Sequence, residues 1–343
     1  MNKMSKRSLF IVILLIFTNA SLCTAASLSE ITNMLVKKTE NSSVVEGIED
    51  WLFLKEELAH IGSGRFWGDE AANVSRSKKK QYADPLPAIL AYNKQLAEKG
   101  ITLYLMPVPP KGLVYPDKLG FEVAGDVSAE QLSIYEEFFT LLRDGGVRVI
   151  DLLPVLLASR EKNDVYCRTD THFSPEGINL FAEAAAEVIK RTAWFSGVDK
   201  KEYIKSVRTV TIHGDLAQMA QLQDAKESID LSFVTVKESG QPEVSDPDSP
   251  VILLGDSHTL VFNAGGDLHA KGAGLFDHLS SRLGFPVDLL GVRGSGVTPA
   301  RVKLFQRSKK DKDYLIGKKV LIWCFTARDF TGSGGWHEIP VAP

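Results

Sequence analysis

Short runs of apolar residues alternate with amphipathic stretches along most of the chain. Five of the runs have the length and flanking residues of buried strands: residues 101–108, 147–153, 251–254, 287–292 and 320–325. Apolar residues at helical spacing predict helices between them, over residues 87–99, 128–143, 175–194, 273–283 and 299–306. Strands that alternate with helices indicate βαβ units. We therefore predict an α/β fold with a parallel sheet of about five strands.

One region, at about residues 197–250, breaks this alternation. Residues 206–213 and 229–237 alternate apolar and polar side chains, as half-exposed strands do. A loop rich in Pro, Ser and Asp follows them. We expect a small antiparallel insertion here, within one domain that spans residues 27–343.

The N-terminus has the pattern of an export signal. Lys3, Lys6 and Arg7 precede an apolar run over residues 9–17, and Thr24 and Ala26 suit positions −3 and −1 of a cleavage site. This pattern predicts a signal peptide over residues 1–26 and export from the cytoplasm. An uncleaved membrane anchor is the alternative, although the apolar run is short for a membrane span.

Charge and cysteine content narrow the possible partners and compartments. Removal of residues 1–26 changes the formal charge from −3 to −6, which argues against nucleic acid or an anionic membrane surface as a partner. Two cysteines remain, Cys167 and Cys324. An oxidising compartment could join them, but we expect two unpaired, buried thiols.

The candidate chemistry begins at Ser257, in the phrase Gly-Asp-Ser directly after the apolar run 251–254. The carboxyl end of a buried parallel strand is where α/β sheets place ligands and nucleophiles. A serine needs a base that is oriented by a carboxylate. Asp170 and His172, one residue apart, provide such a pair. Gly-Asp-Ser alone occurs by chance, but the combination makes Ser-His-Asp catalysis the main hypothesis.

Several phrases together resemble the SGNH-hydrolase-like acetyltransferases of the AlgJ and AlgX type. In chain order they are VEGIEDWLFLKEEL, PVPPKGLVYPDKL, DTHFSPEG, HGDLAQM, LLGDSHT and VLIWCFTARDF. Ordinary SGNH esterases carry the serine phrase near the start, whereas here the Asp-x-His pair comes first, as in this circularly permuted family. The resemblance implies an SGNH-like, flavodoxin-like three-layer sandwich.

The resemblance also implies an activity and roles for the three residues. The family acetylates alginate and related exopolysaccharides in the periplasm. Ser257 would be the nucleophile, His172 the base, and Asp170 the group that orients the imidazole. A polysaccharide substrate and a membrane-bound acyltransferase of the same pathway are the implied partners. No cofactor is implied, and no residue identifies the acetyl donor.

Three further residues are candidates for binding the oxyanion or the substrate. Gly296 falls where ordinary SGNH enzymes have their oxyanion glycine, and Arg328 stands in the place of their asparagine. Arg328 could donate in its place, or form a salt bridge with Asp329 or Asp256; the sequence leaves both open. Lys111 follows a predicted strand and is a candidate for binding substrate, with simple solvation as the alternative.

Two other functions fit the same residues. An esterase or deacetylase would use the same three side chains with water as the acceptor. A non-catalytic scaffold of a polysaccharide export complex would keep the fold alone. The sequence contains no HExxH, paired CxxC or Asp-rich calcium loop, so we expect no metal.

Overall fold

The computed structural model describes residues 26–121 and 127–343. Apart from Ala26, the predicted signal peptide lies outside the described residues. Within the described ranges, no helix is long and apolar enough to cross a membrane.

Five parallel strands form the central sheet, in the order β4-β3-β9-β7-β8. They are β3 (Thr102–Val108), β4 (Arg148–Val149), β7 (Val251–Gly255), β8 (Asp288–Gly291) and β9 (Val320–Thr326). The predicted fold class is confirmed, and each predicted strand overlaps an observed one. The strand predicted over residues 147–153 is too long, because β4 is an edge strand paired only with β3 and Leu153 already begins α7 (Leu153–Ser159).

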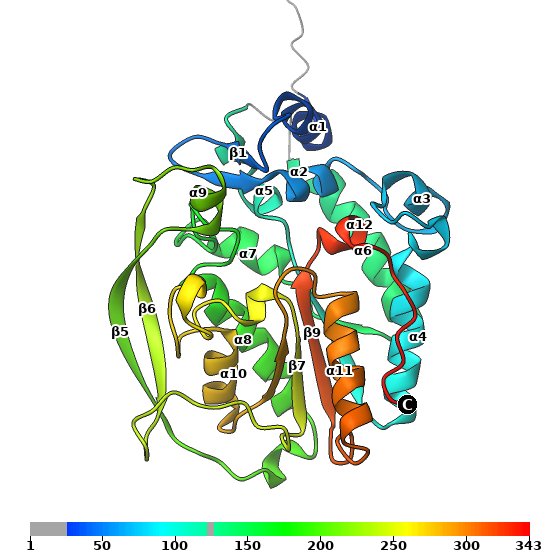
Figure 1. Cartoon of the computed structure of the whole chain (residues 1–343), viewed down its shortest axis with the longest axis vertical. Helices are drawn as coiled ribbons and strands as arrows, with labels where there is room; N and C mark the ends of the chain where they lie inside the picture. The colour runs from blue at the N-terminus through cyan, green and yellow to red at the C-terminus, as the bar shows by residue number, and fades with distance from the viewer. Residues whose placement is uncertain (1–25, 122–126) are drawn as a thin grey trace, which may run out of the picture.

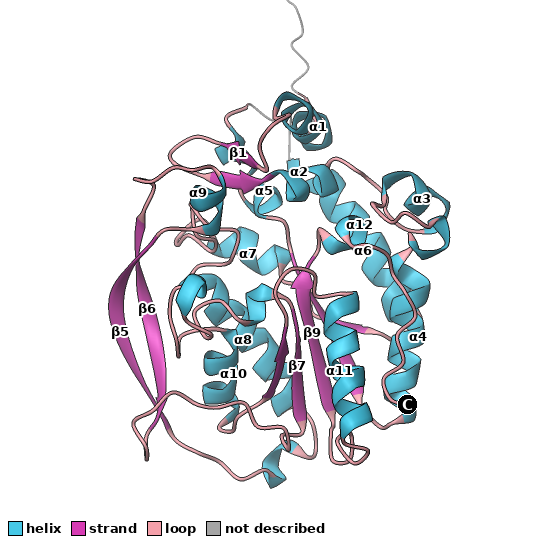
Figure 2. Ribbon diagram, viewed as in Figure 1, coloured by secondary structure: helices cyan, strands magenta, loops and turns pink. Residues whose placement is uncertain are grey.

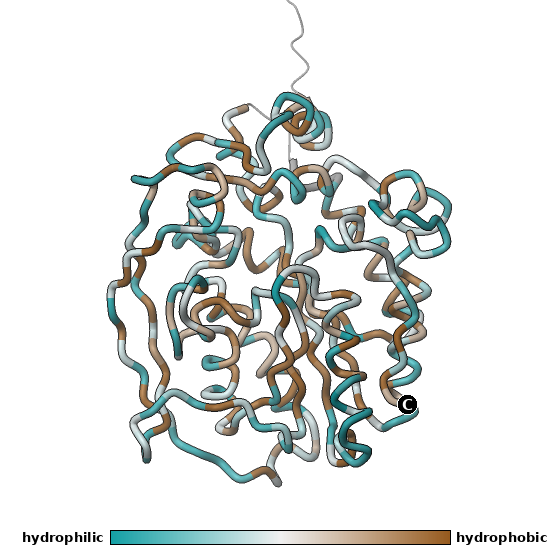
Figure 3. Tube along the Cα trace, in the orientation of Figure 1, coloured by the Kyte–Doolittle hydropathy of each residue, from teal (hydrophilic) through white to brown (hydrophobic). Residues whose placement is uncertain are grey.

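Helices cover both faces of the sheet and complete three layers (Figures 1 and 2). On one side lie α4 (Pro85–Glu98), α6 (Val127–Asp144) and α11 (Thr298–Lys310), and on the other α8 (Pro175–Lys190) and α10 (Leu275–Leu283). Every residue of β7 and β9 is buried, and the chain is brown along these strands in Figure 3. Their continuous apolar sequence follows from this, since a strand covered on both faces has no solvent side.

The region predicted as an insertion contains a long antiparallel ribbon, β5 (Tyr203–Ile212) and β6 (Glu227–Val236). β6 packs on α8 and α10, which explains its alternating sequence, whereas β5 lies outside it and is exposed on both faces along most of its length. A short helix, α9 (Asp215–Met219), stands in the connection between the two strands and was not predicted. The domain boundaries stay a prediction.

The N-terminal elements lie above the carboxyl ends of the strands, at the top of Figure 1. They are α1 (Leu28–Lys38), β1 (Val44–Glu46), β2 (Leu52–Leu54) and α2 (Lys55–Ile61). The short helices α3 (Ala71–Val74), α5 (Lys111–Val114) and α12 (Asp329–Gly332) lie in the same upper part. Cys167 and Cys324 are buried and unpaired, as expected.

Candidate active site

Ser257 stands at the carboxyl edge of the sheet, two residues after strand β7 ends. Gly255 allows this turn, because a Cβ there would lie 1.8 Å from the Cys324 carbonyl oxygen of β9. The Asp256 carboxylate then accepts hydrogen bonds from the His258 N–H at 2.9 Å and the Thr326 N–H at 2.7 Å. These bonds fasten the turn that carries Ser257 to the end of β9.

Asp170 and His172 lie on the loop that precedes α8, whose first turn is capped by the Ser174 side chain. The Asp170 carboxylate bonds both the backbone N–H of His172, at 3.0 Å, and its Nδ1, at 2.6 Å. The other imidazole nitrogen, Nε2, lies 2.8 Å from Ser257 Oγ. The structure thus brings the three residues together in one continuous line of hydrogen bonds.

The chemistry of the carboxylate fixes the tautomer of His172. An ionised carboxylate only accepts, so Nδ1 carries the proton and Nε2 is free to accept from the serine hydroxyl. Burial opposes the charge on both groups, yet the nearby imidazoles of His172 and His269 hold the pKa of Asp170 well below 3.8. In the same way, burial favours neutral His172, but the Asp170 carboxylate outweighs it and raises the pKa of His172 above 6.5.

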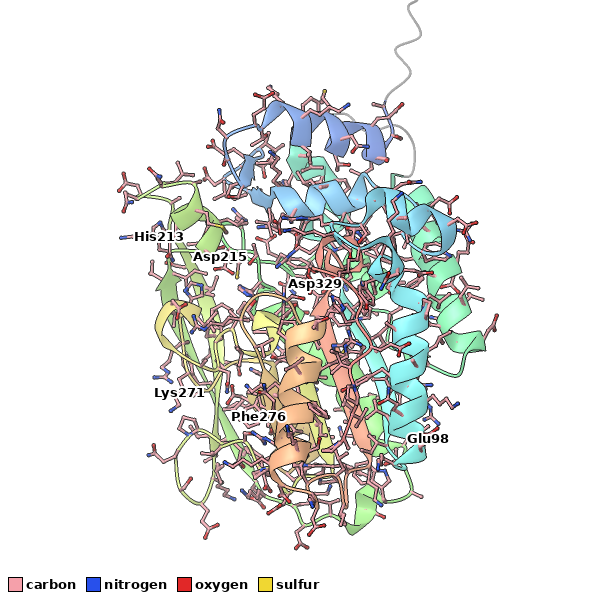
Figure 4. The ribbon with its side chains drawn as sticks, turned by 45° about the vertical axis from the view of Figure 1, so that its right-hand side comes forward. Glu98, His213, Asp215, Lys271, Phe276 and Asp329 are labelled. Carbon is pink, nitrogen blue, oxygen red and sulfur yellow. The ribbon has the colours of Figure 1, made fainter. Side chains whose placement is uncertain are left out.

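Asp215 holds the loop on its other side and lies, like Asp329, at the upper level of the molecule in Figure 4. Its N–H donates to Asp170 Oδ2 at 2.8 Å. Its carboxylate accepts from the Thr171 N–H at 2.7 Å and the Thr171 hydroxyl at 2.6 Å. The HGDL phrase therefore contributes a bond to Asp170 that the sequence did not predict.

Lys111, the first residue of α5, supports the same loop through its buried side chain. Its side chain is fully buried and donates from Nζ to the backbone oxygens of Arg168, at 2.8 Å, and Asp170, at 3.1 Å. Burial lowers the pKa of Lys111 to about 8. The prediction of a substrate-binding lysine is therefore corrected, because both of the possibilities considered, substrate contact and solvation, require an exposed ammonium group.

Gly296 packs directly against the serine turn, but its N–H is already engaged. A Cβ on Gly296 would lie 2.9 Å from Asp256 N. The Gly296 N–H donates to Asp329 Oδ2 at 3.1 Å, and Ser295 Oγ donates to the same oxygen at 2.8 Å. Burial raises the pKa of Asp329 to about 6. The predicted oxyanion donor is therefore close to Ser257 but bonded to a carboxylate in this structure.

Arg328 follows β9 and forms an ion pair that the sequence did not predict. Its Nη1 donates to Glu57 Oε1 at 3.0 Å and to Thr326 Oγ1 at 3.2 Å. Neither Asp329 nor Asp256, the two partners considered, forms the salt bridge. The Arg328 side chain remains 16% exposed, whereas Glu57, on α2, is almost fully buried.

His269 and Glu57 are the site residues that sequence reasoning missed. His269 Nε2 lies 2.8 Å from Asp170 Oδ2, although the two residues are 99 positions apart. His269 comes from a glycine-rich loop, and Glu57 from an amphipathic helix. His269 has no spacing that links it to the Ser257, His172 and Asp170 motifs. Glu57 lies within the phrase VEGIEDWLFLKEEL, but nothing in that phrase distinguishes it from the neighbouring acidic residues.

Asp170, His172 and Asp215 place one possible metal ligand each within 4.8 Å of one another. Both oxygens of Asp170 already accept N–H groups, from His172 on one side and from His269 and Asp215 on the other. Both oxygens of Asp215 accept from Thr171. A cation would have to displace these donors, so the donor set fits a hydrogen-bonded cluster better than a metal site.

A hollow of about 780 Å³ lies behind the same loop, between the start of α8 and the ribbon β5–β6. Cys167, Thr169, Glu176 and Asp230 are among the residues that line it. Ser257 and His172 do not line this hollow, so it is separate from the line of hydrogen bonds.

Comparison with known proteins adds relatives of described activity. The chain is 27% identical over 179 residues to a Pseudomonas syringae pv. tomato protein described as "probable alginate O-acetylase AlgJ". The matched segment covers 52% of this chain and 41% of that protein. It is 28% identical over 211 residues to the "alginate biosynthesis protein AlgX" of Pseudomonas aeruginosa, with 58% and 44% covered. The chain thus spans about two fifths of the length of these relatives.

Two solved structures share the fold. One is the O-acetyltransferase domain of Pseudomonas putida AlgJ, with a TM-score of 0.61 and 22% identity over 84% of this chain and 92% of that chain. The other is Pseudomonas aeruginosa AlgX, with a TM-score of 0.61 and 20% identity over 88% and 67% of the two chains. Residues 44–327 match the family described as "SGNH hydrolase-like domain, acetyltransferase AlgX". Because this match covers most of the chain, the protein belongs to the SGNH hydrolase-like family of the acetyltransferase AlgX.

Proposed function

We propose that this protein is an exported O-acetyltransferase that transfers acetyl groups to hydroxyls of an exopolysaccharide through an acetyl-Ser257 intermediate. The observation that carries the proposal is the line of hydrogen bonds from Asp170 through His172 to Ser257. The description of the AlgJ relative as a probable alginate O-acetylase, and that of the family as an acetyltransferase, support acetyl transfer and an alginate-like polymer as substrate. The periplasm is the proposed location, and a membrane-bound acyltransferase that delivers acetyl groups is the proposed partner.

The geometry suits a two-step exchange. Ser257 Oγ attacks the acetyl carbonyl of a donor while His172 Nε2 takes the hydroxyl proton, and the proton then passes to the leaving group. A sugar hydroxyl next attacks the acetyl-enzyme, gives its proton to His172, and Ser257 leaves with that proton. Asp170 keeps the imidazole in the required tautomer and stabilises its charged form in both steps.

The tetrahedral intermediate of each step carries an oxyanion that needs donors. Within the described residues the Ser257 N–H has no hydrogen-bond acceptor, so it is free to serve. Arg328 is the second proposed donor, since it follows β9 beside the serine turn and stays partly exposed. Gly296 would have to exchange Asp329 for the oxyanion before its N–H could contribute.

Replacement of Arg328 tests its role. We expect Arg328→Ala to slow acylation of Ser257 by on the order of 10²-fold, the usual effect of losing one oxyanion donor. Stopped-flow kinetics with an activated acetyl ester measures this rate. Glu57→Gln is the control, because it breaks the same ion pair but keeps the guanidinium. Equal acylation rates in the two variants would reduce Arg328 to a structural partner of Glu57.

The function itself is tested with acceptor oligosaccharides. The protein is incubated with 4-nitrophenyl acetate, and the sugars are then analysed by mass spectrometry. We expect slow hydrolysis alone, faster turnover when the right oligosaccharide is added, and acetylated sugar as the product. Rapid hydrolysis without acetylated sugar, across several polymers, would favour the esterase. The absence of any acyl-Ser257 would favour a non-catalytic scaffold of an export complex.

A further inference from the structure

We propose that His269 is a positioning residue of this site, which holds the second oxygen of Asp170 so that the first stays aligned with His172. This proposal deepens the proposed function and rests on it. His269 does not touch the reacting atoms, and it acts through the Asp170 carboxylate. His269 is thus a fourth side chain beside Ser257, His172 and Asp170, and it comes from a separate loop.

The contacts of the carboxylate show why a second donor matters. Asp170 Oδ1 faces His172 Nδ1 at 2.6 Å, whereas Oδ2 faces two donors, the Asp215 backbone N–H at 2.8 Å and His269 Nε2 at 2.8 Å. A carboxylate is flat, so a donor that fixes Oδ2 also fixes the direction of Oδ1. The Asp170 side chain is 1% exposed and that of His269 8%. Water therefore has little access to replace the imidazole if it is lost.

The loop that carries His269 is tied at both ends. The buried Asp277, on α10, accepts on Oδ2 from the Asn263 side-chain amide at 3.0 Å and from the Gly274 N–H at 2.9 Å. Inside the loop, the Gly265 N–H donates to the Ala270 carbonyl at 2.8 Å. These hydrogen bonds restrain the loop, so that the His269 side chain is held in one position.

The backbone of His269 itself is in an uncommon conformation, with φ of 71° and ψ of −57°. Few non-glycine residues adopt positive φ, and such conformations persist where the surrounding structure fixes them. Among the described residues, the His269 side chain makes one hydrogen bond, and that bond is to Asp170. Glycine would adopt this backbone conformation with less strain, so the presence of a histidine is explained by the bond from its imidazole to the Asp170 carboxylate.

A pair of substitutions separates hydrogen bonding from packing. His269→Phe keeps a flat ring without a donor, and His269→Gln places an amide N–H near the position of Nε2. Both need the same backbone conformation, so its cost cancels in the comparison. We expect acylation of Ser257 by 4-nitrophenyl acetate to slow roughly 10- to 100-fold in the Phe variant, the range for one hydrogen bond to a charged group. The Gln variant should recover to within a few-fold of wild type, and the loss should fall on kcat rather than KM.

A second readout does not depend on activity. The His172 Nδ1 proton should give a low-field ¹H NMR signal, identified by its absence in His172→Ala. We expect this signal to shift or broaden in the Phe variant and to return in the Gln variant. If the Phe variant does not fold, His269→Asn replaces it, because asparagine tolerates positive φ and its amide is too short to reach Asp170.

His278→Phe is the matched control. His278 is a buried histidine on α10 whose Nε2 bonds the Ser232 carbonyl at 2.9 Å, away from the reacting atoms. In the His278→Phe variant, Ser257 should be acylated at the wild-type rate. Wild-type kinetics and an unmoved signal in His269→Phe, or equal losses in the Phe and Gln variants, would overturn the positioning role. A signal that responds as expected, in a protein without Ser257-dependent acylation, would uphold that role and overturn the proposed function.

Discussion

The Ser257→Ala variant is expected to lose acylation and acetyl transfer by roughly 10⁴- to 10⁶-fold, the range found when a member of a Ser-His-Asp set is removed. In the proposed mechanism the Ser257 hydroxyl is the group that carries the acetyl group. His172→Ala should lose a similar amount, because a neutral hydroxyl without a base is a poor nucleophile. Intact-mass spectrometry after a short exposure to an activated acetyl ester measures the acyl-enzyme directly.

Combining the substitutions sharpens this expectation. Ser257→Ala with His172→Ala should lose hardly more activity than either change alone, since the residues act as one unit. Ser228→Ala is the control, because Ser228 is an exposed serine on the ribbon and should not be the acetylated group. Acylation that persists in Ser257→Ala would refute the proposed nucleophile.

Gly255→Ala is expected to lower the free energy of unfolding by about 3 kcal/mol and to abolish activity with it. The new Cβ would lie 1.8 Å from the Cys324 carbonyl oxygen and 2.7 Å from Thr259 Cγ2. The first of these is backbone of the neighbouring central strand β9, which cannot move without separating the sheet. Any shift that relieves the contact also displaces Ser257, two residues further on.

Urea denaturation measures the loss of stability, and acylation of Ser257 measures the displacement. Gly197→Ala is the control, since a Cβ there meets nothing within 4 Å. Its effect should stay within about 0.5 kcal/mol, as for most surface substitutions. Similar stability of the two variants would mean that the β7–β9 contact is looser than the structure indicates.

The fold was predictable because its elements are written in local patterns. The run Val251–Leu254 is apolar throughout since β7 is covered on both faces, and the sequence of β6 alternates because one of its faces packs on helices and the other does not. Such patterns depend on burial alone and can be seen in short windows. The second strand was overestimated because the chain leaves the sheet after Ile150, whose N–H donates to the Leu105 carbonyl of β3 at 2.8 Å, while Leu152 is buried next to the start of α7.

The partners of the buried polar side chains could not be predicted from local patterns. Lys111 was expected to be accessible because it follows a strand end, yet Trp51, Phe53 and Glu57 of the N-terminal elements pack against it. Arg328 was expected either to donate to the oxyanion or to form a salt bridge with Asp329 or Asp256, and the structure pairs it with Glu57, 271 positions away. Each outcome depended on which distant segment packs over the sheet edge. The sequence around Lys111 or Arg328 does not predict which segment this is.

By itself, the sequence determined the parallel sheet, the serine at the end of its strand, and the Asp-x-His pair, because these depend on periodicity and on spacing within a few residues. Only the tertiary structure decided what surrounds them. It placed His269 and Asp215 on Asp170, Glu57 on Arg328, and Asp329 on the Gly296 N–H. The physical reason is that a buried polar group must find a partner, but any donor or acceptor that folding brings within reach can satisfy it.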